Sequence, residues 1–303
     1  MTSSEPTRLR VAAVGYLNAR PLYEPLCSEA AAARVILECA APSVVARRVA
    51  EGDADIALMP IAAAAALGDL RMVRGCAIGA RGVVRSVVIA ADQPIERLEE
   101  LAVDLSSRTS VVLARLLLRA RHGREPRLIG CSPAEAIASI GGRRGALVIG
   151  DPALEIEGRH RHVLDLGAAW LEHTRLPFVF AAWCGNKGAL TAEGERMLQD
   201  AKDAGLVQRD VIAGIYAAQS GLPVESLRAY LRDAIRYDLG DDERRGLERF
   251  YADAARERLL PEARVRFFDE DRAAPPRPVA LDTVLARAAE GERLSAAEGE
   301  RLS

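Results

Sequence analysis

Short apolar runs alternate with amphipathic segments in the first third of the chain. Between two of the runs, Ser43 to Glu51 carries apolar residues at helical spacing and ends at Gly52, so a helix capped by Ser43 is expected there. The runs are short and largely apolar, as strands buried in a parallel sheet are. This pattern predicts a βαβαβ beginning with strands at Leu9 to Val14, Val35 to Ala40 and Ala54 to Met59.

Two further apolar runs follow at Arg71 to Ile78 and Val83 to Ala91, and from Asp92 the alternation starts again. A second α/β unit inserted between two long strands predicts two lobes, the first at residues 1–91 plus 180–272 and the second at 92–179. In the inserted unit we expect strands at Ala102 to Leu105, Arg127 to Cys131 and Gly145 to Gly150, and helices at Ser107 to His122 and Ser132 to Ile140. A further strand, expected at Phe178 to Trp183, leads the chain back to the first lobe.

The pattern turns helical after Gly188. Apolar residues recur there at spacings of three and four, and the resulting helices should cover the first lobe. A proline-rich stretch at Pro275 to Pro278 then reads as a linker, so residues 273–303 are expected to lie outside the compact domain as a tail. The expected helices are Thr191 to Ala204, Gln208 to Ser220, Val224 to Tyr237 and Asp241 to Leu259.

Composition removes several classes of protein. A chain of 303 residues, half of them hydrophobic, can bury a large core, and a formal net charge of -2 offers no basic field for nucleic acid. No apolar run is long enough to span a membrane and the start has no signal-peptide pattern, so we expect a cytoplasmic protein. The sequence leaves the oligomeric state open, with a homodimer as one alternative.

The cysteines and histidines indicate no metal site. The five cysteines are widely spaced and form no CxxC pair, so we expect reduced thiols in or near the core. The run Arg159 to His162 reads as a solvated loop, because its arginines oppose a bound cation. No Walker loop, GxGxxG fingerprint or GxSxG elbow occurs, so no cofactor is expected.

Polar residues stand where the predicted strands end. Asn18 follows the first strand within GYLNARPL, and ligands bind at such strand ends in open α/β sheets. An ordinary loop in which Asn18 only caps a helix is the alternative. Ser86 lies in a valine-rich run, where a buried hydroxyl must find a partner.

Helix N-termini add candidate anion sites. Ser43 opens one predicted helix, and Ser107, Thr109 and Ser110 open another, so free N–H groups and the helix dipole could hold carboxylates there. Simple capping is the alternative for each of them. Two charged candidates complete the set: Asp151 either lines the cleft or caps the turn at Pro152, and Arg20 is a carboxylate partner or a solvated side chain.

Seven segments, in this order, resemble one enzyme family. The resemblance covers about Arg10 to Phe268, and the combination of segments is specific although each motif alone is weak. The chain is similar in them to the chorismate dehydratases of the futalosine route to menaquinone. The segments are GYLNARPL, APSVVA, GDADIALMPI, GVVRSVVI, DLSSRTSVVLARLLL, LVIGDPAL and LDLGAAWLEHTRLPFVFAAW.

The resemblance implies a fold and a reaction. The fold is α/β, two-lobed like type II periplasmic binding proteins, with a ligand cleft between the lobes and a helical C-terminal part. The reaction converts chorismate to 3-[(1-carboxyvinyl)oxy]benzoate and water without metal or organic cofactor. The resemblance marks Asn18 and Ser86 as the catalytic positions. The residues themselves leave a substrate carboxylate, water or Asp151 as candidates for the proton acceptor.

Two alternatives to this function stay open. The related 1,4-dihydroxy-6-naphthoate synthases have a similar fold and use a histidine, which His173 could supply here, and a non-catalytic solute-binding domain is the other alternative. The tail resembles the opening helices of radical-SAM enzymes of the same pathway, as if a fused enzyme were cut short. No CxxxCxxC cluster motif is present, so that activity cannot reside in this chain.

Overall fold

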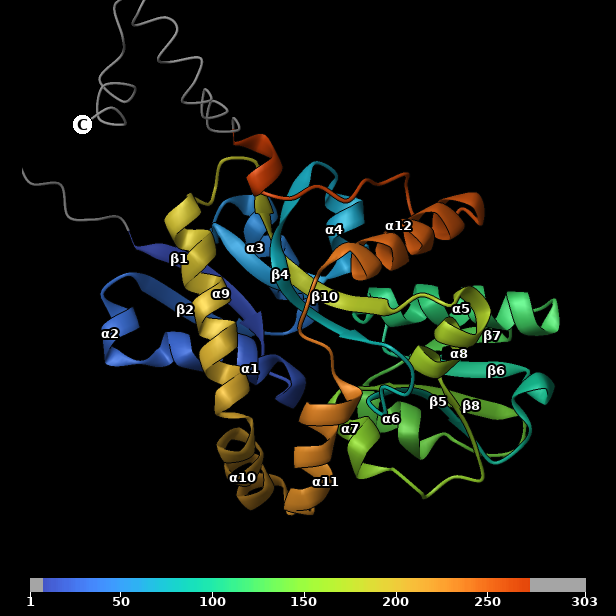
Figure 1. The fold of residues 1–303 in the computed structure, drawn as a ribbon. Coiled ribbons are helices and arrows are strands. Elements are labelled where there is room, and N and C mark those ends of the chain that lie inside the picture. Colours follow the sequence, from blue (N-terminus) through green and yellow to red (C-terminus); the bar gives the residue numbers. More distant parts are fainter. Residues whose placement is uncertain (1–7, 273–303) are drawn as a thin grey trace, which may run out of the picture. The chain divides into compact units, whose positions relative to one another are not determined.

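Two separate five-stranded sheets organise residues 8–272, the part of the chain that the computed structural model describes (Figure 1). The first sheet has the order β2-β1-β3-β10-β4 and the second the order β7-β6-β8-β5-β9. The first consists of β1 (Leu9–Val14), β2 (Val35–Ala40), β3 (Ile56–Pro60), β4 (Leu70–Ala80) and β10 (Phe178–Asn186). The second consists of β5 (Val87–Ala91), β6 (Glu100–Val103), β7 (Arg127–Gly130), β8 (Arg144–Ile149) and β9 (His162–Asp165).

Each sheet combines a parallel core with one reversed strand. β1 pairs in parallel with β2 and β3, and β6 pairs in parallel with β7 and β8, as the alternating pattern predicts. β10 runs antiparallel between β3 and β4, and β5 runs antiparallel between β8 and β9. The reversed strands follow the two passages of the chain from one sheet to the other.

These passages define the two lobes and correct one expected boundary. The chain crosses at residues 81–86, between β4 and β5, and crosses back at residues 175–177, before β10. β5 pairs in the second sheet, so its placement in the first lobe, implied by a boundary after residue 91, is wrong. The other limits of the lobes stay a prediction.

Helices cover both sheets and connect the strands (Figure 1). The first lobe and its C-terminal extension contain α1 (Arg20–Tyr23), α2 (Glu29–Ala32), α3 (Pro42–Glu51), α4 (Ile61–Leu67), α9 (Ala192–Val207), α10 (Arg209–Ser220), α11 (Val224–Ala229) and α12 (Asp241–Arg256). The second contains α5 (Arg108–His122), α6 (Pro133–Ala138), α7 (Asp151–Glu155) and α8 (Leu166–Thr174). Single turns occur as 3-10 helices η1 (Leu17–Ala19), η2 (Glu24–Cys27), η3 (Ile95–Arg97) and η5 (Asp269–Asp271), and as a π-helix, η4 (Tyr230–Ala234).

The expected helices and most strands are confirmed, with local differences. The strand expected from Val83 begins only at Val87, because the chain bends sharply before it with Arg85 at a φ of 64°. The sequence pattern misses α4, α8 and β9. α4 is almost all alanine, so its apolar residues show no periodicity, and β9 starts inside the Arg and His run that was expected to be a solvated loop.

An aromatic cluster packs where the chain crosses back into the first sheet. Phe178 of β10 meets Trp170 of α8 and Phe250 of α12 edge to face, with ring centroids 5.3 and 5.1 Å apart. The Trp170 indole donates to the Pro177 carbonyl oxygen at 3.2 Å. A Cβ on Gly246 of α12 would lie 2.1 Å from that same oxygen, so only glycine allows α12 to approach the crossing this closely.

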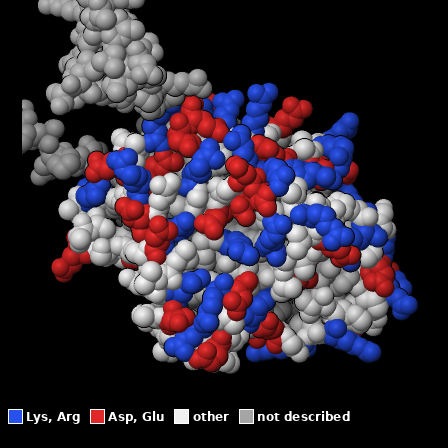
Figure 2. Space-filling model, in the orientation of Figure 1, with Lys and Arg blue, Asp and Glu red and all other residues white. Residues whose placement is uncertain are grey.

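The surface carries mixed charge, and two of the cysteines are more exposed than the sequence predicted. Acidic and basic side chains are interspersed on the face shown in Figure 2, and none of the helices within residues 8–272 combines the length and apolarity that a bilayer crossing requires. All five cysteines are free, but Cys27 and Cys39 are exposed rather than close to the core. The expected linker and tail, 273–303, lie outside the described residues.

Candidate active site between the lobes

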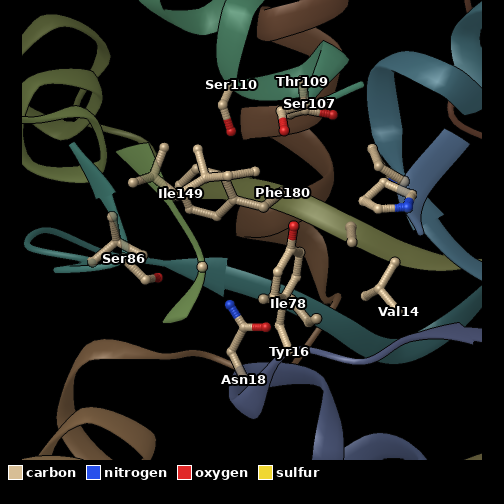
Figure 3. A pocket seen from close by; sticks show the side chains of 16 residues that line it. Val14, Tyr16, Asn18, Ile78, Ser86, Ser107, Thr109, Ser110, Ile149 and Phe180 are labelled. Carbon is tan, nitrogen blue, oxygen red and sulfur yellow. The ribbon is translucent and has the colours of Figure 1, made fainter. Parts of the chain in front are cut away.

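A cavity lies between the two lobes, where the ends of β1 and β3 face β5, β8 and the start of α5 (Figure 3). The space between its walls, counted with the part open to solvent, is about 590 Å³. Among the residues that the structure describes, sixteen line the cavity, and all of them are uncharged. They are Val14, Tyr16, Asn18, Pro42, Pro60, Ile78, Val84, Ser86, Val87, Ser107, Thr109, Ser110, Ile149, Gly150, Phe180 and Ala181.

Asn18 reaches the cavity from the turn that follows β1. It is the middle residue of η1, is 9% exposed, and its amide projects into the cavity in Figure 3. Pro21 lies in the first turn of α1, which begins at Arg20, and a missing N–H costs no helical hydrogen bond at that position. Asn18 therefore lies at a strand end as the sequence predicted, and its side chain makes no capping hydrogen bond.

Ser86 reaches the cavity from the first crossing, not from within a strand as expected. It directly precedes β5, and its N–H donates to the Val84 carbonyl oxygen at 2.7 Å to close a tight turn. Asp165 accepts hydrogen bonds from the N–H groups of Val84 (3.1 Å) and Arg85 (2.7 Å). Ser86 is fully buried, and its hydroxyl has no hydrogen-bond partner among the described residues, so an acceptor or donor from a ligand can use it.

The N-terminus of α5 forms the opposite wall. Ser107 is its first flanking residue and donates to the Asp104 carboxylate at 3.1 Å, while Thr109 Oγ1 accepts from the Ala62 N–H of the first lobe at 3.1 Å. The Ser107 and Ser110 hydroxyls point toward the cavity in Figure 3. No side chain caps α5, so the N–H groups of its first turn remain directed at the cavity side.

Three of the predicted binding residues do not line the cavity. Ser43 lies exposed on α3, whose flanking residue is Ala41, and no side-chain cap is made, so the capping expectation is wrong. Arg20 pairs with Glu24 at 3.1 Å and lies over the Tyr216 ring, 5.2 Å from its centroid. Ser43 is therefore exposed to solvent, and Arg20 contacts Glu24 and Tyr216 rather than the cavity.

Asp151 is the third, and it joins the lobes instead. Its carboxylate accepts from the Leu17 N–H at 3.0 Å, directly beside Asn18. Burial raises the pKa of Asp151, although the Leu17 N–H and the Tyr216 hydroxyl both favour the charged form. Its neighbour Gly150, not Asp151 itself, lines the cavity.

The sequence analysis missed Tyr16 and Phe180. Tyr16 lies inside GYLNARPL, directly after the first strand, so its position beside Asn18 was a signal that could have been used. Burial raises the pKa of Tyr16, and its hydroxyl points toward the α5 side of the cavity in Figure 3. Gly150 has a φ of 66°, and a Cβ there would lie 2.8 Å from the Tyr16 ring, so glycine makes room for this ring.

No cofactor or metal is indicated by these side chains. Within residues 8–272 no cluster of three or more His, Cys, Asp or Glu side chains could hold a metal ion. His173 is exposed on α8 and is not a lining residue, so the cavity does not offer it as a base. The cavity can orient an anion through the α5 N-terminus and donate neutral hydrogen bonds through Asn18 and Ser86.

The fold and the cavity define a two-lobed α/β protein of the periplasmic-binding-protein type. A protein from Archaeoglobus fulgidus superposes with a TM-score of 0.67, 16% identity, and coverage of 86% of this chain and 100% of that one. The periplasmic aliphatic sulphonate binding protein of Escherichia coli superposes with a TM-score of 0.63, 16% identity, and coverage of 88% and 98%. At such identities the likeness shows the fold alone.

The chain belongs to the menaquinone biosynthesis family, whose model matches residues 9–256. It is 29% identical over 187 residues to the chorismate dehydratase of Thermus thermophilus, a match covering 56% of this chain and 68% of that protein. It is 32% identical over 117 residues to the chorismate dehydratase of Campylobacter jejuni, covering 38% of this chain and about half, 51%, of that relative.

Proposed function

We propose that this protein is a chorismate dehydratase, a hydro-lyase that converts chorismate to 3-[(1-carboxyvinyl)oxy]benzoate and water. The observation that carries the proposal is the pairing of two buried neutral groups, Asn18 and Ser86, with the α5 N-terminus across one uncharged cavity. Family membership and the names of the two relatives support the same reaction.

The reaction needs little from the protein beyond orientation. Chorismate loses the proton of its ether-bearing ring carbon, the C–H electron pair enters the ring, and the neighbouring hydroxyl leaves with a proton as water. Aromatisation supplies the driving force, so positioning and hydrogen bonding to the leaving hydroxyl are the main demands. Asn18 and Ser86 can donate such bonds in their neutral forms.

The two negative charges of chorismate must be stabilised by dipoles and N–H groups, because the described residues that line the cavity carry no positive charge. The α5 helix is 15 residues long and directs its N-terminus to the cavity, where its dipole and free N–H groups favour a carboxylate. Ser110 adds a hydroxyl on the same side. We assign one substrate carboxylate to this wall, which leaves the hydroxyl-bearing edge of the ring facing Asn18 and Ser86.

The proton acceptor is then not a side chain of the cavity wall. The described lining residues include no Asp, Glu or His, and Asp151 is bound to the Leu17 N–H outside the wall. A carboxylate of the substrate itself or a water molecule remains as the acceptor.

Incubation of the purified protein with chorismate tests the proposal. Formation of the aromatic product in the presence of a metal chelator is the expected result. Consumption of cyclic dehypoxanthinyl futalosine with chorismate left unchanged would assign the chain to the naphthoate synthases. Tight binding of chorismate without any product would make it a solute-binding domain.

A further inference from the structure

Tyr230 approaches the catalytic groups from the C-terminal helical part. It is the first residue of the π-helix η4, which follows α11, and its side chain is completely buried. π-turns inside helices are rare and often occur at functional sites, because they displace a side chain from its regular position. No motif of the sequence singles out this residue.

Two buried hydroxyls meet here without ordinary partners. The hydroxyls of Tyr230 and Ser86 are both buried, and neither makes a hydrogen bond of regular distance and angle within the described residues. Burial raises the pKa of the Tyr230 hydroxyl. Hydrogen bonding with the Ser86 and Asn18 side chains offsets only part of this rise in pKa. The phenol thus stays protonated at neutral pH and lies beside both predicted catalytic groups.

Arg85 contacts both α11 and the Tyr230 ring and directly precedes Ser86. Its guanidinium pairs with Glu157 at 2.6 Å and donates to the Ser226 hydroxyl at 2.6 Å, which joins the crossing segment to α11. The same guanidinium lies 5.8 Å from the centroid of the Tyr230 ring. Because Arg85 directly precedes Ser86, the position of the phenol relative to Ser86 is set by these contacts.

We propose that Tyr230 is a positioning residue that orients the Ser86 hydroxyl toward the substrate, an inference that rests on the proposed dehydratase function. A serine hydroxyl carries a single proton and rotates freely when nothing holds it. Tyr230 donates to Ser86 Oγ, and the Ser86 proton is then directed at the leaving hydroxyl of the substrate. Buried polar groups of this kind are costly unless they complete such a chain of hydrogen bonds.

The test combines Tyr230→Phe with Ser86→Ala. Tyr230→Phe keeps the ring and removes the hydroxyl, and we expect kcat for chorismate to fall about tenfold with KM changed less than about twofold. In the Ser86→Ala background the same change should alter kcat by less than about twofold, because its target is gone. An unchanged kcat, or equal losses in both backgrounds, overturns the inference.

Tyr237→Phe is the matched control. Tyr237 is also buried, with a hydroxyl that has no partner among the described residues, but neither the Ser86 nor the Asn18 side chain acts on that hydroxyl. Its variant should keep the wild-type kcat and the wild-type melting temperature, because the change removes a buried hydroxyl that has no partner among the described residues. A loss of kcat in Tyr237→Phe equal to that in Tyr230→Phe would overturn the specific role.

A second measurement separates this inference from the proposed function. If the wild-type protein leaves chorismate unchanged, the proposed function fails, and the contact is then judged by melting temperatures of the two single variants and the double variant. Non-additive shifts support the contact between Tyr230 and Ser86. Additive shifts overturn it.

Discussion

Asn18 and Ser86 are neutral side chains that line the cavity, and the proposed function gives them hydrogen bonds to the leaving hydroxyl of the substrate. Asn18 caps no helix, and the Ser86 hydroxyl makes no hydrogen bond within residues 8–272 apart from the proposed one with Tyr230. Their contribution is therefore expected in the reaction rather than in folding. Tyr16 and Gly150 shape the same space by packing against each other.

Asn18→Ala and Ser86→Ala should each lower kcat by about 100-fold or more, which is typical for loss of one transition-state donor. Their melting temperatures should change little, and Ser28→Ala, an exposed hydroxyl of the first lobe, should leave both quantities unchanged. Steady-state kinetics and thermal unfolding check this. Near-normal turnover with a melting temperature several degrees lower would assign both residues a structural role.

Gly150→Ala should impair binding through Tyr16. The new methyl group would lie 2.8 Å from the Tyr16 ring and would also strain a backbone with φ of 66°, so KM should rise and stability should fall. Gly142→Ala is the control, because its φ is 55° and nothing lies within 4 Å of the added Cβ. It should lose stability only, and an equal rise in KM for both variants would contradict the role of the Tyr16 contact.

At the scale of elements, the turn before β5 depends on a carboxylate from β9. Asp165 accepts hydrogen bonds from the N–H groups of Val84, Arg85 and Ala168, so it orders the turn and caps α8 at once. Since Ser86 follows this turn directly, the position of its hydroxyl depends on a contact that links two segments of the second lobe.

Asp165→Ala should lower both stability and turnover. Hydrogen bonds to a charged acceptor are worth about 1.5–3 kcal/mol each, and we expect a net loss of about 2–3 kcal/mol in the free energy of unfolding after water enters. Asp92→Ala removes only the contact of that carboxylate with His160 at 3.1 Å, near the surface, and should have little effect. Chemical denaturation and kinetics check this. Wild-type turnover in Asp165→Ala would show that the turn keeps its conformation without the carboxylate.

At the scale of the whole molecule, several contacts join the lobes, and three of them lie near the cavity or the second crossing. The aromatic cluster packs the second crossing, Thr109 accepts from the Ala62 N–H, and Asp151 accepts from the Leu17 N–H. The last of these involves a partly buried carboxylate, whose pKa burial raises above its ordinary value of 3.8. The folded protein therefore holds the Asp151 proton more tightly than the unfolded chain does.

This makes the lobe contact sensitive to pH. The stabilisation from proton binding at Asp151 is fully present below pH 3.8 and is lost as pH rises through the folded pKa. Asp151→Asn keeps an acceptor for the Leu17 N–H and does not titrate, so its melting temperature relative to wild type should rise between pH 4 and pH 7. A relative melting temperature that falls over this range would mean that the folded state favours the ionised carboxylate.

Much of the fold was predictable because it follows from local patterns. The apolar runs of β1, β2 and β3 and the amphipathic helices α5, α9, α10 and α12 were expected close to their observed positions. The pattern failed at α4, whose alanines have no polar face, and at Ser86, where the bend around Arg85 ends the strand early. Hydrophobic periodicity does not record such turns, since Asp165 stabilises this one from far along the chain.

The sequence by itself determined the alternation of strands and helices, the division into two lobes and the position of Asn18 at a strand end, because burial and helix formation depend on neighbouring residues. Only the tertiary structure decided which polar residues share the cavity. It brought Tyr16, Phe180 and the start of α5 together with Asn18 and Ser86, and left Ser43, Arg20 and Asp151 outside the wall. These positions depend on how the chain crosses between the sheets and on buried contacts such as Leu17 with Asp151, which join segments that no local pattern relates.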